Sequence, residues 1–250
     1  MKIALFLLIG LLLSSSVLAQ NITLKDYNDW SITDVSQLGL KKEKLFSQMN
    51  DELIKVGDSI CSNRAMVWAW DFKRFYQVDA AKIFLFYTQK KSGFGEITWW
   101  YHVAPVINEK GTLFVMDAGF PGFILRPTTI SDWLESFARS TQCKEIQAHE
   151  TELIELMFDG HVFPKKTSYG THNCYYKITP AGYWTPTSVA QGLLGVDENG
   201  TKIDYRRESI DIEEVYQACI EAVTSKLGWA MGAGKAKCKK YLGLSESFTN

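Results

Sequence analysis

Residues 58–65 constrain the fold of this chain more than any other stretch, because they place a cysteine at the predicted start of a helix. Asp58 or Ser59 is expected to cap that helix, since a short side-chain oxygen accepts hydrogen bonds from backbone N–H groups one turn further on. Apolar residues then recur at helical spacing, and the helix is expected to end near Phe75. Cys61 thus lies in the first turn, at the positive end of the helix dipole, where the reactive thiolate is favoured.

The five cysteines of the chain decide whether Cys61 is available for chemistry, since an odd number leaves at least one thiol unpaired. Cys219 and Cys238 lie in one C-terminal segment, and Cys143 and Cys174 flank another, so two local disulfides are the economical arrangement. That pairing leaves Cys61 free. The alternative, with Cys61 in a disulfide or merely buried, would make it a structural residue.

The first 19 residues are typical of a secretory signal peptide. A lysine comes first, an apolar run follows over residues 3–13, and small residues precede Gln20. The run is too short for a membrane-spanning helix, which needs about 20 apolar residues. We therefore expect a mature chain that begins at Gln20, is secreted to the periplasm or outside the cell, and has no stable association with a membrane.

The composition of the mature chain favours a globular protein without a nucleic-acid partner. The formal net charge is −1 and becomes −2 when Lys2 is removed. Neither value is the excess of positive charge that is typical of a nucleic-acid-binding protein. A hydrophobic fraction of 46% is enough for a substantial core. About 230 residues suit one large domain or a domain with a small appendage.

Three predicted strands follow the first helix, over residues 81–87, 97–107 and 112–116, with a loop at 90–95. The second strand carries His102, and Asp117 comes at the end of the third. Asparagine and glycine at the ends of residues 108–111 are typical of a hairpin turn.

The length of that turn decides whether the histidine and the acid meet. A two-residue loop at Glu109 and Lys110 would place His102 directly opposite Asp117. A three-residue loop with a glycine bulge would shift the register by one residue and turn Asp117 away, unless it lies just past the ladder. The pattern supports the pair, and the register stays open.

Further helices are predicted on either side of these strands. A helix capped by Ser131 is expected to run to Arg139, with Trp133, Leu134 and Phe137 as its apolar stripe. Residues 150–158 suit a short helix or strand, and 160–187 is rich in turns and aromatic residues. The other two predicted helices are 41–56 and 209–228.

Cysteine, histidine and aspartate in this order are the residue types of a thiol hydrolase. The imidazole takes the thiol proton and later gives it to a leaving amine. The acid orients the imidazole and stabilises its charged form. Cys61, His102 and Asp117 are therefore candidate catalytic residues.

Zinc binding is the rival chemistry. His161, His172 and Cys174, with Asp159 or His149, are residue types that bind zinc. The close ligand spacings that make such a prediction strong are absent, however. We expect no metal and no other cofactor.

Several blocks of the sequence resemble the secreted bacterial protein glutaminases, which are protein-glutamine deamidases. The blocks are residues 61–65, 82–87, 99–106, 114–117 and 131–134. The resemblance covers roughly residues 55–145. It implies that Cys61 is the nucleophile, His102 the general base and acid, and Asp117 the orienting acid.

The resemblance also implies an architecture. It is an α+β fold similar to the transglutaminase core of the papain-like type, with the nucleophile helix packed on an antiparallel sheet. The hydrolase core would span residues 20–145. Residues 146–250 contain three of the four paired cysteines and a further helical segment, and would complete the same domain or form a small appendage.

The function implied is deamidation of glutamine side chains in proteins or peptides, through a thioester on Cys61. We expect Ser62, Trp99, Trp100 and Tyr101 to contact the substrate. A transglutaminase, a cysteine protease and a small-molecule or cell-wall amidase would use the same three residues, so these alternatives stay open. A non-catalytic exported binding protein is the alternative from another class, and it requires an inert Cys61.

Overall fold

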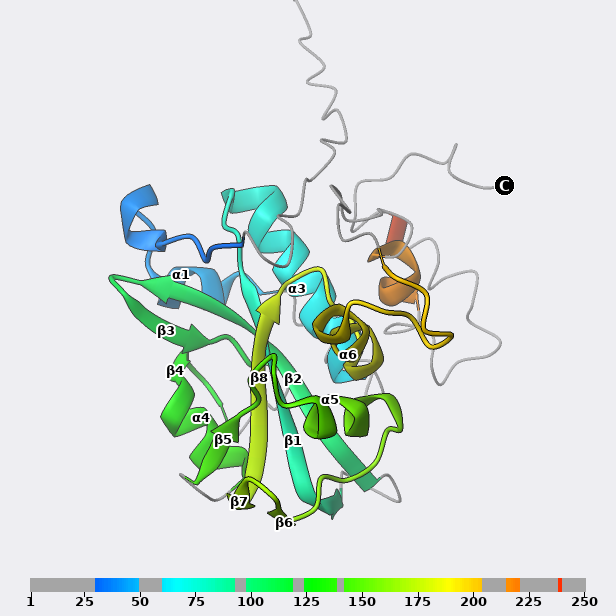
Figure 1. The fold of residues 1–250 in the computed structure, drawn as a ribbon. Helices are drawn as coiled ribbons and strands as arrows, with labels where there is room; N and C mark the ends of the chain where they lie inside the picture. Colours follow the sequence, from blue (N-terminus) through cyan, green and yellow to red (C-terminus); the bar gives the residue numbers. More distant parts are fainter. Residues whose placement is uncertain are drawn as a thin grey trace, which may run out of the picture.

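The computed structural model of the protein describes residues 30–49, 60–92, 98–118, 124–138, 142–203, 215–220 and 238–239. Within these ranges the chain has a mixed α+β fold on a six-stranded sheet, which confirms the predicted class (Figure 1). None of the described helices is long and apolar enough to cross a membrane. The predicted signal peptide lies outside the described residues.

The sheet is antiparallel except at one edge, with the order β4-β3-β2-β1-β8-β5 and a parallel pairing between β5 and β8. Its strands are β1 Ala81–Ser92, β2 Thr98–Glu109, β3 Thr112–Val115, β4 Thr128–Thr129, β5 Cys143–Glu145 and β8 Cys174–Pro180. A separate pair is formed by β6 Lys166–Thr167 and β7 Gly170–Thr171. The long strands β1 and β2 therefore lie in the middle of the sheet.

Alternate side chains of β1 serve the two faces of the sheet, as the two-residue period of a strand requires. Phe84 and Phe86 pack into a cluster with α5 (Thr151–Phe158) and α6 (Pro186–Leu194). Ile83 and Leu85 pack on the opposite face against α4 (Ile130–Ala138). Figure 1 shows α4 on one side of the sheet and α5 with α6 on the other. Burial on both faces explains why β1 reads as a continuous apolar run.

The predicted cysteine-bearing helix is confirmed as α3 (Cys61–Tyr76). Its N-cap residue is Ile60, whose side chain makes no capping bond; Asp58 and Ser59, where the cap was expected, lie outside the described residues. Gln77 ends the helix in a left-handed conformation, with φ of 58°, and its N–H bonds to carbonyls of the last turn.

The remaining helices are shorter. The 3-10 helix η1 (Val35–Leu38) and α1 (Lys42–Ser47) pack with α3 and the helical residues 215–220 in one apolar cluster. The predicted helices 41–56 and 209–228 are thus confirmed in these parts, and their other residues lie largely outside the described ranges. The helical alternative for residues 150–158 is confirmed by α5.

The β2–β3 hairpin is present, but both expected registers are wrong. Its two-residue loop is Lys110 and Gly111, with φ of 55° and 83°, so Glu109 pairs with Thr112. Two positive φ values match the twist of a tight hairpin, and glycine adopts one without strain. The observed pairing is shifted by two residues from the first expected register. Because side chains alternate between the two faces of a sheet, a shift of two leaves every side chain on the face that was expected. Because β3 ends at Val115, Asp117 lies just past the ladder, as one alternative anticipated.

Three smaller expectations also need correction. Ser131 lies inside α4, and the hydroxyl of Thr129 instead accepts from the N–H of Asp132 at 3.2 Å. β1 continues to Ser92, so residues 90–92 of the predicted loop are strand, and its remaining residues lie outside the described ranges. The turn-rich region 160–187 contains β8, which pairs with the central strand β1.

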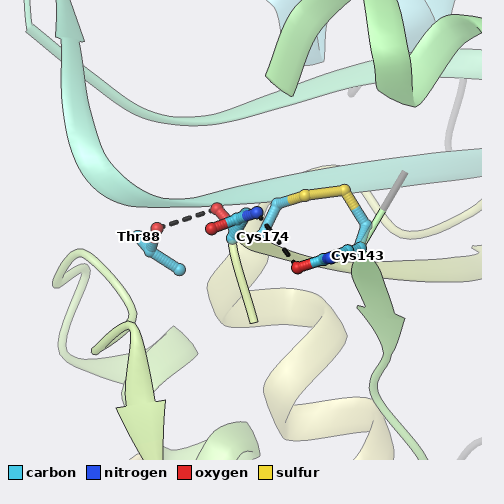
Figure 2. Close-up of a disulfide and its surroundings, with 5 residues drawn as sticks. Thr88, Cys143 and Cys174 are labelled. Atoms are coloured by element: carbon cyan, nitrogen blue, oxygen red, sulfur yellow. Dashed lines mark hydrogen bonds between the residues drawn. A yellow bond between two sulfur atoms is a disulfide. The ribbon is translucent and has the colours of Figure 1, made fainter. Parts of the chain in front are cut away.

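Both predicted disulfides are confirmed, Cys143 with Cys174 and Cys219 with Cys238, and Cys61 is the free cysteine. The first disulfide joins the parallel strands β5 and β8 at the edge of the sheet (Figure 2). It fastens the segment that follows α4 to the body of the sheet.

Candidate active site

Cys61 lies where the N-terminus of α3 meets the edge of β2. β3 pairs with β2 only from Val106 onward, so the earlier part of β2 has no β3 neighbour. There the backbone of Val103 hydrogen-bonds to the Cys61 thiol. Cys61 is only partly buried. The thiol is therefore held between a helix N-terminus and a strand edge.

His102 and Asp117 form the expected pair. His102 Nε2 lies 2.7 Å from Asp117 Oδ2, and their side chains are 1% and 2% exposed. Trp133 Nε1 donates a second hydrogen bond to the same Oδ2, at 2.9 Å. Asp117 is thus fixed from two elements, β2 and α4. The pair exists although the predicted register was wrong, because Asp117 reaches His102 from beyond the end of β3.

Cys61 and His102 share a hydrogen bond that completes the row of three residues. Asp117 occupies Nε2 of the imidazole, so Nδ1 is the nitrogen that is left for the sulfur. The structure thus brings together all three residues that the sequence singled out. Their catalytic roles stay predictions.

The electrostatic interactions among these three side chains favour the charged form of each. Burial raises the pKa of the Cys61 thiol, but the hydrogen bond and charge of His102, with a smaller effect of Arg64, lower it to a greater extent. Burial lowers the pKa of His102, whereas the charge and hydrogen bond of Asp117 raise it more strongly. Burial also raises the pKa of Asp117, but His102 and then Trp133 bring it below its ordinary value. A thiolate, an imidazolium and a carboxylate are therefore the favoured forms.

Three aromatic rings enclose the imidazole. Phe137 stacks on His102 at 4.5 Å between ring centroids, and Trp99 and Trp133 each lie at 5.7 Å. Such rings exclude water, which strengthens the interactions of His102 with its charged neighbours. From the sequence, Trp133 and Phe137 were expected only as the apolar stripe of a helix. Their spacing of four residues, one helical turn, is the signal that both would face the same target.

The chain can now be compared with known proteins. Residues 42–137 match the sequence profile of the glutaminase family. This match confirms the resemblance expected from the sequence, over a segment that contains Cys61, His102 and Asp117. Curated proteins provide no match.

Two solved structures are similar in fold. The NMR structure of protein-glutaminase from Chryseobacterium proteolyticum is 18% identical, with a TM-score of 0.42, over 78% of this chain and 89% of that one. A crystal structure of pro-protein-glutaminase is 17% identical, with a TM-score of 0.41, over 82% of this chain and 64% of that one.

Arg64 is a further charged residue within the glutaminase-matching segment, and it was not singled out from the sequence. It lies one helical turn after Cys61, and its residue is only 8% exposed. Its positive charge lowers the pKa of both Cys61 and Asp117. Arg64 follows Cys61 by three residues, which places both on one face of the helix. That spacing is the signal that could have identified Arg64 from the sequence.

The predicted substrate-contacting residues differ in accessibility. Ser62 is fully buried, and Tyr101 donates a hydrogen bond to its hydroxyl at 3.4 Å. Trp99 covers the imidazole, and Trp100 packs beside Tyr101 with ring centroids 4.8 Å apart. All three aromatic residues keep part of their surface exposed. A contact of Ser62 with substrate would have to use its backbone.

The residues weighed for zinc do not assemble in the part of the chain that the structure describes. No group of three or more metal-binding side chains occurs there. Cys174 is in a disulfide, so it supplies no thiolate ligand. This removes the one sulfur ligand from the alternative.

Proposed function

We propose that this protein hydrolyses the side-chain amide of glutamine in proteins or peptides to glutamate, with release of ammonia. The observation that carries the proposal is the hydrogen-bonded row of Cys61, His102 and Asp117, inside a segment that matches the glutaminase family. The helix-borne cysteine against a strand-borne histidine also supports the finer proposal of a transglutaminase-like core.

In the first half of the reaction, the Cys61 thiolate attacks the carbonyl carbon of the glutamine amide. The developing oxyanion accepts a hydrogen bond from the backbone N–H of Cys61, at the positive end of α3. The imidazolium of His102 then protonates the departing nitrogen, and ammonia leaves. The product on the enzyme is a thioester between Cys61 and the glutamate side chain.

In the second half, neutral His102 takes a proton from water while the water oxygen attacks the thioester. The carbon–sulfur bond breaks, glutamate is released, and the thiolate and imidazolium are restored. Asp117 stays ionised throughout, because it stabilises the charged imidazole and holds its orientation. The net reaction consumes one water and one amide and yields one carboxylic acid and one ammonia, which at neutral pH become carboxylate and ammonium.

The setting that we propose for this activity is outside the cytoplasm. The signal-like residues 1–19 and the two disulfides support export into an oxidising compartment. Protein or peptide substrates would meet the enzyme there.

The test is ammonia release from a glutamine-rich protein by the chain and by Cys61→Ala, followed by mass spectrometry of the substrate. We expect ammonia and the single mass-unit gain of glutamine-to-glutamate conversion with the unchanged chain only. Crosslinks would indicate transfer to an amine, and chain cuts would indicate proteolysis. An identical result from the two proteins, with Cys61→Ala folded by circular dichroism, would overturn the proposal.

A further inference from the structure

A polar hollow of about 280 Å³ opens at the end of β1 that points away from α1. It lies on the periphery of the candidate active site and belongs to none of the residues assigned a role so far. Its described lining comes from β1, the end of α4 and the segments before β6 and β8. The lining residues are Tyr87, Thr88, Gln89, Lys91, Ala138, Lys165 and Asn173.

Three connections place this hollow beside His102. Tyr87 is two residues along β1 from Leu85, which is the cross-strand partner of His102. Residues two apart on a strand share a face, so the Tyr87 ring lies on the same side as the imidazole. The charges of Cys61 and Asp117 also act on the Tyr87 hydroxyl.

The other two connections come from the rings that enclose the imidazole. Lys91 is the cross-strand partner of Trp99, and Trp99 stacks on His102. Ala138 follows Phe137, whose ring is the nearest of the three to His102. Two lining residues of the hollow thus adjoin two of the rings that enclose the imidazole.

The lining is positively charged. Lys91 and Lys165 supply two cations, and no described lining residue carries a carboxylate. Burial, and then the charges of Cys61 and Asp117, raise the pKa of Tyr87, so its hydroxyl stays neutral. The side-chain amides of Gln89 and Asn173 add neutral donors, and the Asn173 amide also donates to Gln142 Oε1 at 3.4 Å.

The wall of the hollow is fixed in place. Thr88 Oγ1 donates to the backbone carbonyl of Asn173 at 2.7 Å, which ties β1 to the start of β8. Asn173 precedes Cys174, and Figure 2 shows this bond beside the disulfide to Cys143. The Lys91 ammonium lies over the Tyr87 ring, 5.8 Å from its centroid, so one charge of the hollow is already positioned before a carboxylate binds.

We propose that this hollow binds an acidic side chain of the protein substrate, a few residues from the glutamine that reacts. The inference rests on the proposed function, and it names the substrate class as glutamine flanked by aspartate or glutamate. An extended chain advances about 3.3 Å per residue, so a hollow beside the rings that enclose the imidazole suits a flanking residue and not the glutamine itself.

The first experiment compares two peptides that are identical except that glutamate or serine flanks the single glutamine. We expect the glutamate peptide to have a KM lower by roughly fivefold at low salt, as two exposed charge pairs allow. The double variant Lys91→Glu with Lys165→Glu should lose or invert this preference. The matched control reverses Lys44 and Lys202, exposed lysines that do not line the hollow, and should keep it.

A binding measurement separates the subsite from the chemistry. Fluorescence anisotropy would follow the labelled glutamate peptide on Cys61→Ala, with and without the two lysine reversals. Weaker binding by the reversed protein alone supports the subsite. Equal binding, or equal KM for the two peptides with the unchanged chain, overturns it. Absence of ammonia with both peptides instead contradicts the proposed function, and the anisotropy result still decides the subsite.

Discussion

β2 takes part in two ion pairs, one through His102 in its first half and one through Glu109 at its last residue. The distances between the charged atoms are similar, but the surroundings of the two pairs differ. His102 and Asp117 lie 2.7 Å apart, with side chains 1% and 2% exposed. Glu109 and Lys42 lie 2.6 Å apart, with side chains 14% and 20% exposed. The first pair is surrounded by aromatic rings, and the second joins α1 to the tip of the hairpin at the surface.

The difference shows that the environment of a charge pair, more than the distance between its atoms, sets what the pair can do. A charge whose partner is removed from a dry site stays uncompensated, because no water replaces the partner. At a wet site, water and salt take over most of the interaction. The buried pair therefore tunes a third group, Cys61, while the exposed pair serves at most to hold two elements together.

The largest expected effect comes from breaking the buried pair with Asp117→Asn. An amide can donate to Nε2, which would force the proton onto Nδ1, the nitrogen that must accept from the Cys61 thiol. We expect kcat for ammonia release to fall by about 10³ to 10⁴, as for a triad with the wrong imidazole tautomer. Steady-state kinetics with a glutamine peptide measure this.

Circular dichroism and a count of free thiols would show whether Asp117→Asn keeps the fold and both disulfides. A folded Asp117→Asn protein with kcat within tenfold of the unchanged chain would remove Asp117 from the proposed mechanism. The distinction between the two pairs of β2 would then lose its functional meaning.

A subtler change, Trp133→Phe, keeps an aromatic ring beside His102 but removes the hydrogen bond to Asp117. Loss of this bond raises the pKa of Asp117 and frees the carboxylate to turn. A hydrogen bond to a charged group contributes about 1.5 kcal/mol or more, so we expect kcat to fall by roughly tenfold or more. KM should stay unchanged, because Trp133 contacts the acid and not the substrate.

Trp70→Phe is the matched control for this variant. Trp70 is a buried indole of α3, 3% exposed, in a different apolar cluster. The Trp70→Phe protein should lose about as much free energy of unfolding as the Trp133→Phe protein, but its kcat should stay unchanged. Equal kcat for the two variants would mean that Trp133 acts through packing alone.

The residues of the site were easier to predict than their surroundings. Cys61 and His102 are rare residue types in this chain, and Cys61 and Asp117 lie at the ends of strongly patterned segments, so local sequence found them. Trp133 was found only as an apolar helix residue, since nothing local tells a core indole from one that donates to an acid. Arg64 was missed for a similar reason, because a long polar side chain on a helix usually faces solvent.

The fold could be predicted where its pattern is local. β1 and α3 have clear periodicity and were found, whereas β8 was hidden because its neighbours β1 and β5 are far away in the sequence. The register of the hairpin was missed because Lys110 takes a positive φ, which asparagine or glycine would have signalled more clearly. The rest of the sheet depends on pairings between segments that are far apart in the sequence, which no local pattern indicates.

The pH dependence of Cys61 alkylation tests the charge state that the buried pair imposes. The pKa of Cys61 is lowered, so its thiolate is present at lower pH than in an ordinary thiol. An ordinary thiol gains roughly 80-fold in thiolate between pH 6 and pH 8, so iodoacetamide should react with Cys61 over a visibly smaller range. The pKa of His102 is raised to about 9, so kcat/KM should fall above that pH as the imidazolium loses its proton.

The same protein unfolded in urea with its disulfides intact provides the reference, because Cys61 is then its one ordinary thiol. Asp117→Asn should shift the alkylation profile of the folded protein toward this reference. Matching profiles for folded and unfolded protein would contradict the thiolate and imidazolium pair.

The smallest effect is expected from the exposed pair, with Lys42→Met. Methionine keeps the apolar stem beside Phe114, which the lysine ammonium covers at 4.5 Å, and removes the charge that meets Glu109. We expect the free energy of unfolding to fall by less than about 1 kcal/mol, and kcat to stay unchanged. Urea unfolding with and without 1 M NaCl measures it, since salt at about that concentration should erase the difference between the two proteins. A loss comparable to that of Trp133→Phe, or any loss of kcat, would show that the two ends of β2 are coupled and that exposure alone does not separate their roles.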